Sequence, residues 1–176
     1  MRRLLLLSSL AIGLVIPLTP VVCFAQANAS QANASQTNDG FNLSSVDALL
    51  AKGDREAASG NLTEAVKSYD KARNASRSLL SFYRDLGGAF RGLDARIPRD
   101  MDQKGRESIE KLAQANLRLA AVYRRQNQSE VAVPLLVEVV KLMTPSTVDG
   151  RKAYQQLVEV GFVSTPYAAP AAAATN

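Results

Sequence analysis

The chain has 176 residues, one cysteine, no histidine and a formal net charge of +5, and its length is typical of a single domain. The absence of histidine excludes histidine general bases, serine–histidine triads and zinc sites that need histidine. The one cysteine, Cys23, lies in the apolar N-terminal stretch, so a processed form without that stretch has no thiol nucleophile and no disulfide.

The N-terminus is typical of an export signal, predicted to span residues 1–25. Two arginines precede an apolar run from Leu4 to Ile16, and small residues near Ala25 favour cleavage. The run is shorter than the roughly 20 residues of a membrane-spanning helix. We expect a soluble protein, periplasmic or secreted, exported by a bacterial-type route. A lipoprotein anchored at Cys23 is the alternative, but the usual small residue is missing before this cysteine.

Two further segments are predicted to be disordered. Residues 26–43 form a polar leader with almost no side chains to bury. Residues 163–176 form a tail rich in proline and alanine, in which the prolines prevent a long helix. The folded domain is therefore predicted to span residues 44–162.

Within this domain apolar side chains recur at helical spacing and no strand-like alternation occurs, so the predicted fold class is all-α. A Ser or Asn three residues before an Asp or Glu, at positions 44, 61 and 146, predicts a capped helix start. Pro98 predicts a break. Short connections predict antiparallel neighbours. The six predicted helices lie near residues 44–59, 62–75, 77–94, 101–126, 129–143 and 146–161.

A pattern of small and aromatic residues begins in the first predicted helix. Gly53, Gly60, Ala65, Tyr69 and Ala72 follow one another at intervals that resemble the tetratricopeptide repeat, a 34-residue pair of antiparallel helices. In that family small residues stand where the two helices cross closely. The aromatic residue fills the space between one hairpin and the next.

Two further units follow at nearly the same interval. Gly87 and then Ala120 come after Gly53 at successive distances close to the length of one family repeat. The middle unit departs from the family pattern, because residues 95–111 are either a short irregular piece or the front of a long fourth helix. Arg77 also replaces the closing proline of the first unit. The residues in register in the second and third units are Tyr83, Leu86, Gly87, Phe90, Leu119, Ala120, Tyr123, Asn127, Ala132, Leu136 and Val139.

This resemblance predicts antiparallel helical hairpins stacked as a short tetratricopeptide-like array of about three units. The middle unit is degenerate, and the helix near 146–161 caps the exposed end. An unrelated helical bundle is the alternative fold.

Positive charge is concentrated in the centre of the chain. Between Lys71 and Arg125 there are thirteen Lys and Arg residues against six Asp and Glu. A solvated surface is one interpretation, and a site for an acidic protein or an anionic lipid surface is the other. Nucleic acid is not expected as a partner of an exported protein. The candidate partner-binding residues are Lys67, Arg77, Arg84, Arg91 and Arg118.

The resemblance implies a scaffold or adaptor that binds a protein or peptide and catalyses no reaction. We assign no catalytic residue, cofactor or metal ligand. Asp100 and Asp102 come nearest to a carboxylate pair, but residues two apart do not share a helix face. The alternative function is peripheral binding to an anionic membrane or cell-envelope polymer.

Overall fold

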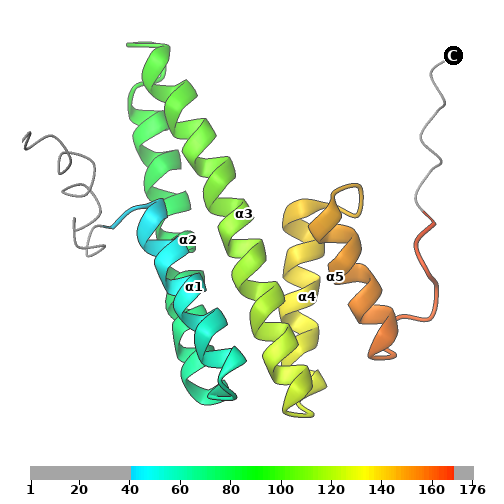
Figure 1. The fold of residues 1–176 in the computed structure, drawn as a ribbon. Helices are drawn as coiled ribbons and strands as arrows, with labels where there is room; N and C mark the ends of the chain where they lie inside the picture. Colours follow the sequence, from blue (N-terminus) through cyan, green and yellow to red (C-terminus); the bar gives the residue numbers. More distant parts are fainter. Residues whose placement is uncertain (1–40, 169–176) are drawn as a thin grey trace, which may run out of the picture. The chain divides into compact units, whose positions relative to one another are not determined.

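The computed structural model describes residues 41–168. Within this range the chain forms five α-helices and no strand, which confirms the all-α prediction (Figure 1). The predicted export signal, nearly all of the predicted leader and the end of the predicted tail lie outside the described residues. The helices are α1 (Leu43–Ala58), α2 (Leu62–Ala89), α3 (Arg96–Arg125), α4 (Ser129–Met143) and α5 (Val148–Glu159).

Each helix packs mainly against the next one along the chain, as the short connections predict. Consecutive helices run antiparallel (Figure 1). The helices α2 and α3 share the most extensive contact, whereas α1 also contacts α3, and α3 also contacts α5.

The prediction of separate helices at 62–75 and 77–94 was wrong. Residues 62–89 form the single continuous helix α2. No proline occurs between them, and the first glycine is Gly87, near the end of the helix. A helix continues until a residue disfavours it, and Arg77, which stands where the repeat family has proline, does not.

The predicted break before the next helix is confirmed, but its position was not correct. The turn spans residues 90–95, and α3 begins at Arg96, ahead of the predicted start at 101. Pro98 therefore lies in the first turn of α3. The first four N–H groups of a helix have no partner within the helix, so the missing N–H of proline removes no hydrogen bond there. Residues 96–111 are thus the front of a long helix, and Ala95 precedes it.

The helix starts were predicted more accurately than the residues that cap them. Asn42, not Ser44, caps α1. Its side-chain oxygen accepts from the Ser45 N–H, and its own backbone N–H donates to the Ser45 hydroxyl. Asn61 occupies the cap position of α2, but its side chain makes no capping hydrogen bond. Thr147, not Ser146, caps α5 by accepting from the Gly150 N–H at 3.1 Å.

The turns contain residues that tolerate a left-handed backbone. Gly60 has φ of 83° between α1 and α2, and Asn127 has φ of 58° between α3 and α4. Gly161, with φ of 74°, follows the end of α5. These positions agree with the predicted turns, since glycine and asparagine adopt this conformation at low cost.

The largest fully buried apolar side chains are Leu119, Leu136, Val46 and Val139, and they belong to one core shared by all five helices. Small residues allow helices to approach closely at several points in it. A Cβ atom placed on Gly53 of α1 would lie 2.4 Å from the ring of Tyr69 in α2. That distance is shorter than van der Waals contact allows, so the Tyr69 ring leaves no room for a side chain at position 53 where α1 and α2 cross.

Burial repeats between the first and the second half of the domain, at the offset that separates Gly53 from Ala120. The buried residues Val46, Leu50 and Gly53 of α1 correspond to buried Ala113, Leu117 and Ala120 of α3. The same offset relates buried residues of α2 to buried residues of α4, namely Ala65 to Ala132, Tyr69 to Leu136 and Ala72 to Val139. It also relates the two left-handed turn residues Gly60 and Asn127. The α1–α2 and α3–α4 pairs are therefore built on one pattern.

The helices α2 and α3 extend beyond their neighbours (Figure 1). With a rise of 1.5 Å per residue, α2 and α3 are about 42 and 45 Å long, whereas α1 and α4 are about 24 and 23 Å. The extending part, residues 81–104, is called the α2–α3 tip below. Gly87 lies in this tip, where a Cβ atom would be 3.2 Å from the Met101 Cβ.

Candidate functional site

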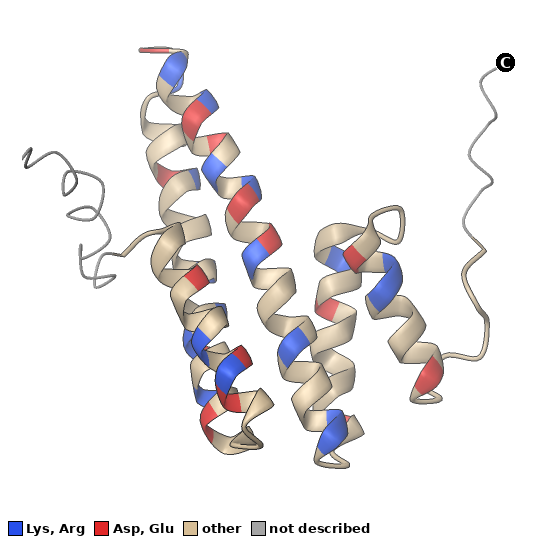
Figure 2. Ribbon diagram, in the orientation of Figure 1, with Lys and Arg blue, Asp and Glu red and all other residues tan. Residues whose placement is uncertain are grey.

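The structure does not bring the five predicted partner-binding residues together. Four of them lie on α2 or in the turn after it, and their side chains have different surroundings. Arg118 lies on α3 and contacts α1. Figure 2 shows positively and negatively charged residues interleaved along the helices of the described part of the chain.

Arg77 belongs to an ion cluster that joins α2 to α4. Its Nη2 atom donates to Glu138 Oε1 at 2.6 Å and to Oε2 at 2.8 Å. Arg73 Nη2 also donates to Glu138 Oε2, at 3.1 Å. Burial acts to raise the pKa of Glu138, but the hydrogen bonds and charges of Arg77 and Arg73 outweigh it, so this pKa lies below its usual value. The role of Arg77 in this structure is to hold two helices together.

We expect the contribution of Glu138 to stability to depend on pH. A carboxyl group whose pKa is lower in the folded state stabilises the fold above its unfolded pKa, about 4.3 for Glu, and this effect is lost as pH falls through the folded value. Glu138→Gln should therefore lower the free energy of unfolding at pH 7. Urea unfolding followed by circular dichroism should show the difference from wild type shrinking between about pH 5 and pH 3. A difference that is constant over this range would contradict the assignment.

The other basic residues of α2 lie at its surface. Lys67 is exposed and pairs with Glu64 of the same helix, at 2.6 Å. Arg84 and Arg91 are exposed at the α2–α3 tip, and no acidic side chain of the described part forms an ion pair with them. Arg91 follows the end of α2, so the seven-residue spacing of Arg77, Arg84 and Arg91 does not continue as one helical row.

A different row of cations, missed in the sequence, runs along α3. Lys104, Lys111, Arg118 and Arg125 recur every seven residues, a spacing that keeps them on one side of a helix. The last three contact α1. Lys111 Nζ lies 2.6 Å from Asp47 Oδ1, Arg118 Nε lies 2.9 Å from Asp54 Oδ1, and Arg125 Nη1 donates to the Ala57 carbonyl at 3.3 Å. In the sequence, the matching seven-residue spacing of Asp47 and Asp54 indicates that these acidic residues pair with the row on α3.

Asp54 links this row to the core. The Tyr69 hydroxyl donates to Asp54 Oδ1 at 2.8 Å, and Arg118 donates to the same oxygen. Burial, followed by the hydrogen bond to Asp54, raises the pKa of the Tyr69 hydroxyl well above its usual range. By donating to Asp54, the hydroxyl helps to orient the carboxylate that positions Arg118.

Beside Arg118 a hollow of about 330 Å³ lies between α3 and α5. It offers two side-chain amides, two cations and one carboxylate, which together can donate to carbonyl groups, accept from N–H groups and pair with either charge. The Gln156 Oε1 atom is buried and has no hydrogen-bond partner in the described part of the chain. The residues that line this α3–α5 hollow are Gln114, Leu117, Arg118, Ala121, Asp149, Lys152 and Gln156.

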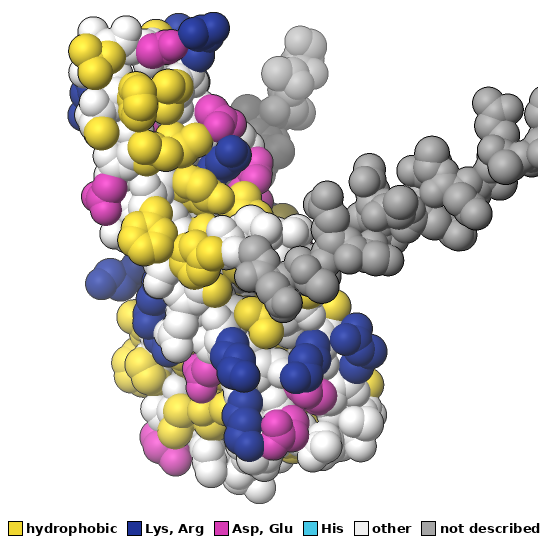
Figure 3. All heavy atoms as spheres, turned by 90° about the vertical axis from the view of Figure 1, so that its left-hand side faces the viewer, with side chains coloured by type: hydrophobic (Ala, Val, Ile, Leu, Met, Phe, Trp, Pro, Cys, Tyr) yellow, Lys and Arg dark blue, Asp and Glu magenta, His cyan; other side chains and the backbone are white. Residues whose placement is uncertain are grey.

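The α2–α3 tip carries exposed apolar side chains. Phe82 and Leu86 of α2 are 57 and 46 % exposed, and Leu93 in the turn is 80 % exposed. Phe41 packs edge-on against Phe82, with ring centroids 5.6 Å apart. Figure 3 shows hydrophobic side chains gathered on the upper part of the face that it views, which is this tip.

The described helices were compared with the requirements of a membrane span and of a metal site, and the chain was compared with known families. None of the helices α1 to α5 is both long and apolar enough to cross a membrane. In residues 41–168 no group of three or more His, Cys, Asp or Glu side chains is arranged to hold a metal ion. No family model matches the chain, and no curated protein matches it.

Proposed function

We propose that this protein is an exported, non-enzymatic scaffold that binds a protein or peptide partner on the face formed by α1, the C-terminal half of α3, and α5. The observation that carries the proposal is the repetition, at one constant offset, of the buried and turn positions of α1–α2 in α3–α4. Two hairpins built on one pattern present equivalent helices side by side, and such surfaces serve in binding.

The repeated hairpins support a tetratricopeptide-like arrangement in a modified form. In this form α1 with the first half of α2 is one unit, and the second half of α3 with α4 is another. The α2–α3 tip is an inserted hairpin in the place of the predicted middle unit. Helix α5 starts a further unit and caps the second hairpin, since buried Ala153 follows buried Ala120 at nearly the length of one family repeat.

This arrangement selects the binding face. Helices of successive units that contact one another can form the concave surface by which such arrays bind, and the first helices do so here, because α1 contacts α3 and α3 contacts α5. The first helices here are α1, α3 and α5, and of the five basic residues predicted from sequence only Arg118 lies on them. We therefore assign partner contacts to the α3–α5 hollow, with Gln114, Arg118, Lys152 and Gln156 as the polar groups.

The chemistry of the hollow fits a peptide segment. The amide of Gln114 can both donate and accept, as the backbone of an extended peptide requires, and the amide nitrogen of Gln156 can donate. Lys152 is exposed, and no acidic side chain of the described part forms an ion pair with it, so it is available for a carboxylate of the partner. Arg118 is already held by Asp54 and would contribute a positioned donor.

Site-specific photocrosslinking tests the proposed face. A benzophenone amino acid is placed at Gln114 or Lys152, and for comparison at the exposed residues Lys71 of α2 and Lys141 of α4. We expect a discrete adduct with a protein of the exported fraction from the first pair and none from the second. Adducts of equal yield from both pairs, or from the α2 and α4 positions alone, would show that the face is wrong.

A further inference from the structure

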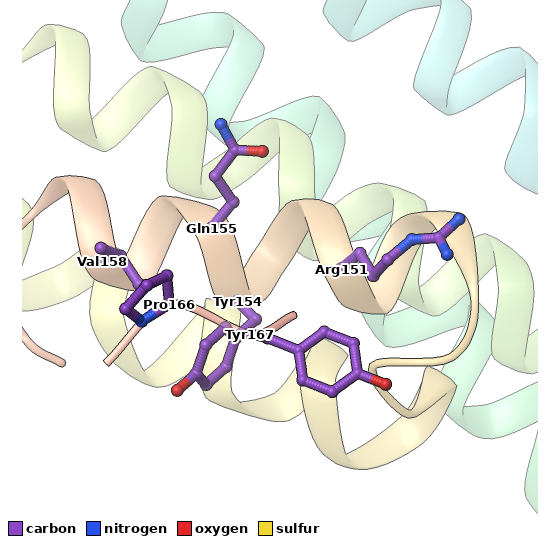
Figure 4. A pocket seen from close by; sticks show the side chains of 6 residues that line it. All are labelled: Arg151, Tyr154, Gln155, Val158, Pro166 and Tyr167. Carbon is purple, nitrogen blue, oxygen red and sulfur yellow. The ribbon is translucent and has the colours of Figure 1, made fainter. Parts of the chain in front are cut away.

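A second hollow lies on the side of α5 away from the α3–α5 hollow. Positions 151, 154, 155 and 158 project from the side of the helix opposite to positions 149, 152 and 156, as their helical spacing requires. The segment that follows α5 turns at Gly161 and covers part of this second side. Between segment and helix remains a pocket of about 370 Å³, shown in Figure 4, lined by Arg151, Tyr154, Gln155, Val158, Pro166 and Tyr167.

The contacts of this segment are specific. The Tyr154 hydroxyl donates to the carbonyl of Thr165 at 2.8 Å. The rings of Tyr154 and Tyr167 meet edge to face, with centroids 6.2 Å apart and an interplanar angle of 74°. Figure 4 shows Pro166 beside Val158 and both tyrosine rings on the same side of α5, while Gln155 extends away from them. The segment thus offers a carbonyl, a proline ring and an aromatic ring in sequence.

This set of contacts is the kind by which aromatic grooves bind extended proline-containing peptides. The ring of a proline fixes its own φ, and it disfavours the helical conformation for the residue before it, so Thr165-Pro166 is extended with little loss of entropy on docking. The carbonyl before the proline stays free of secondary structure and can accept from a tyrosine hydroxyl. Proline rings against aromatic side chains then supply the apolar contact.

We propose that this side of α5 is a docking site for an extended proline-containing segment of a partner protein, and that the chain's own Thr165-Pro166-Tyr167 occupies it as an intramolecular competitor. Arg151 favours a partner whose segment also carries an acidic residue. Its side chain is exposed, and no acidic side chain of the described part pairs with it. The segment from 161 to 168 contains no acidic residue, so such a partner gains an ion pair that the chain's own segment does not make.

If the chain's own segment competes for the site, a variant whose segment no longer docks should bind an added peptide more tightly than wild type does. A tethered ligand competes at an effective concentration of about millimolar. Exchanging both Pro166 and Tyr167 for alanine in the full chain removes the proline and aromatic contacts without shortening the chain. This opened variant should bind a labelled peptide with the sequence STPYAAP about tenfold more tightly than wild type does, as measured by fluorescence anisotropy. A peptide with Asp in place of the first Ala should bind more tightly still.

Three control experiments test whether the labelled peptide binds in this pocket and through its proline. Adding Tyr154→Phe to the opened variant should weaken peptide binding about threefold to tenfold, the effect of one lost hydrogen bond. Adding Lys152→Ala, on the opposite side of α5, should leave it unchanged. A peptide with alanine for proline should bind at least about tenfold more weakly. Equal binding by wild type and the opened variant, no dependence on proline, or a concentration-dependent dimer of the wild-type chain through exchanged tails would each overturn the proposal. Loss of photocrosslinking at Gln114 alone would affect only the proposed function.

Discussion

Replacing Gly53 by alanine is expected to lower the free energy of unfolding by about 2 kcal/mol. In most helices this exchange is stabilising, by about 0.5 to 1 kcal/mol, because alanine has the higher helix propensity. Here the new methyl group would lie 2.4 to 2.9 Å from three atoms of the Tyr69 ring. The ring cannot turn aside without cost, because it is 2 % exposed and its hydroxyl is bonded to Asp54. Urea unfolding followed by circular dichroism gives the value.

The equivalent position in the second hairpin provides the matched test. Ala120 stands where the first hairpin has Gly53, and Leu136 stands where it has Tyr69. The double exchange Gly53→Ala with Tyr69→Leu copies this second pair into the first hairpin. We expect the double variant to be more stable than Gly53→Ala alone, with a coupling energy of at least about 1 kcal/mol. If the two exchanges lowered the free energy of unfolding additively, the crossing of α1 with α2 would not be equivalent to that of α3 with α4.

Gly88 supplies the control for helix propensity. It lies in α2, and a Cβ atom there would meet nothing within 4 Å. Gly88→Ala should therefore raise the free energy of unfolding by about 0.5 to 1 kcal/mol. If alanine lowered the free energy of unfolding at both positions, the effect at position 53 would not be due to a close crossing of helices.

The local structure of the folded part was predictable because its signals are local. Apolar spacing predicted the helical class, and Gly60, Asn127 and Gly161 predicted three turns that the structure confirms. The repeat pattern does not predict the continuity of α2, because the residue that follows the first unit decides whether the helix ends there. Arg77 is a good helix former, and only a proline or glycine there would have ended the helix.

The candidate site was harder to predict, because it depends on which helix faces lie side by side. Arg77, Arg84 and Arg91 share a spacing of seven residues, but one pairs with α4, one lies at the tip and one lies beyond the helix end. Lys111 and Arg118 share the same spacing and do face one neighbour, α1. Spacing alone does not distinguish these cases. The basic residues that face a neighbouring helix are recognised by a matching row of acidic residues on that helix. Here this row is Asp47 and Asp54 of α1.

The proposed binding face predicts a large effect on affinity. Exchanging Gln114 for alanine together with Lys152 for glutamate removes one amide and reverses one charge in the α3–α5 hollow. A charged hydrogen bond contributes about 1.5 to 3 kcal/mol and a neutral one about 1 kcal/mol. The pair should therefore weaken binding of the partner by at least about tenfold. Neither side chain belongs to the core, so the free energy of unfolding should change little.

The most direct test of the binding face compares two double variants with the partner identified by photocrosslinking. Dissociation constants are measured by isothermal titration calorimetry for wild type, for Gln114→Ala with Lys152→Glu, and for Arg84→Glu with Arg91→Glu. We expect at least about tenfold weaker binding for the first variant and less than about twofold change for the second, whose residues lie on the α2–α3 tip and on no first helix. The opposite order, with binding lost only when Arg84 and Arg91 are reversed, would contradict the proposed face.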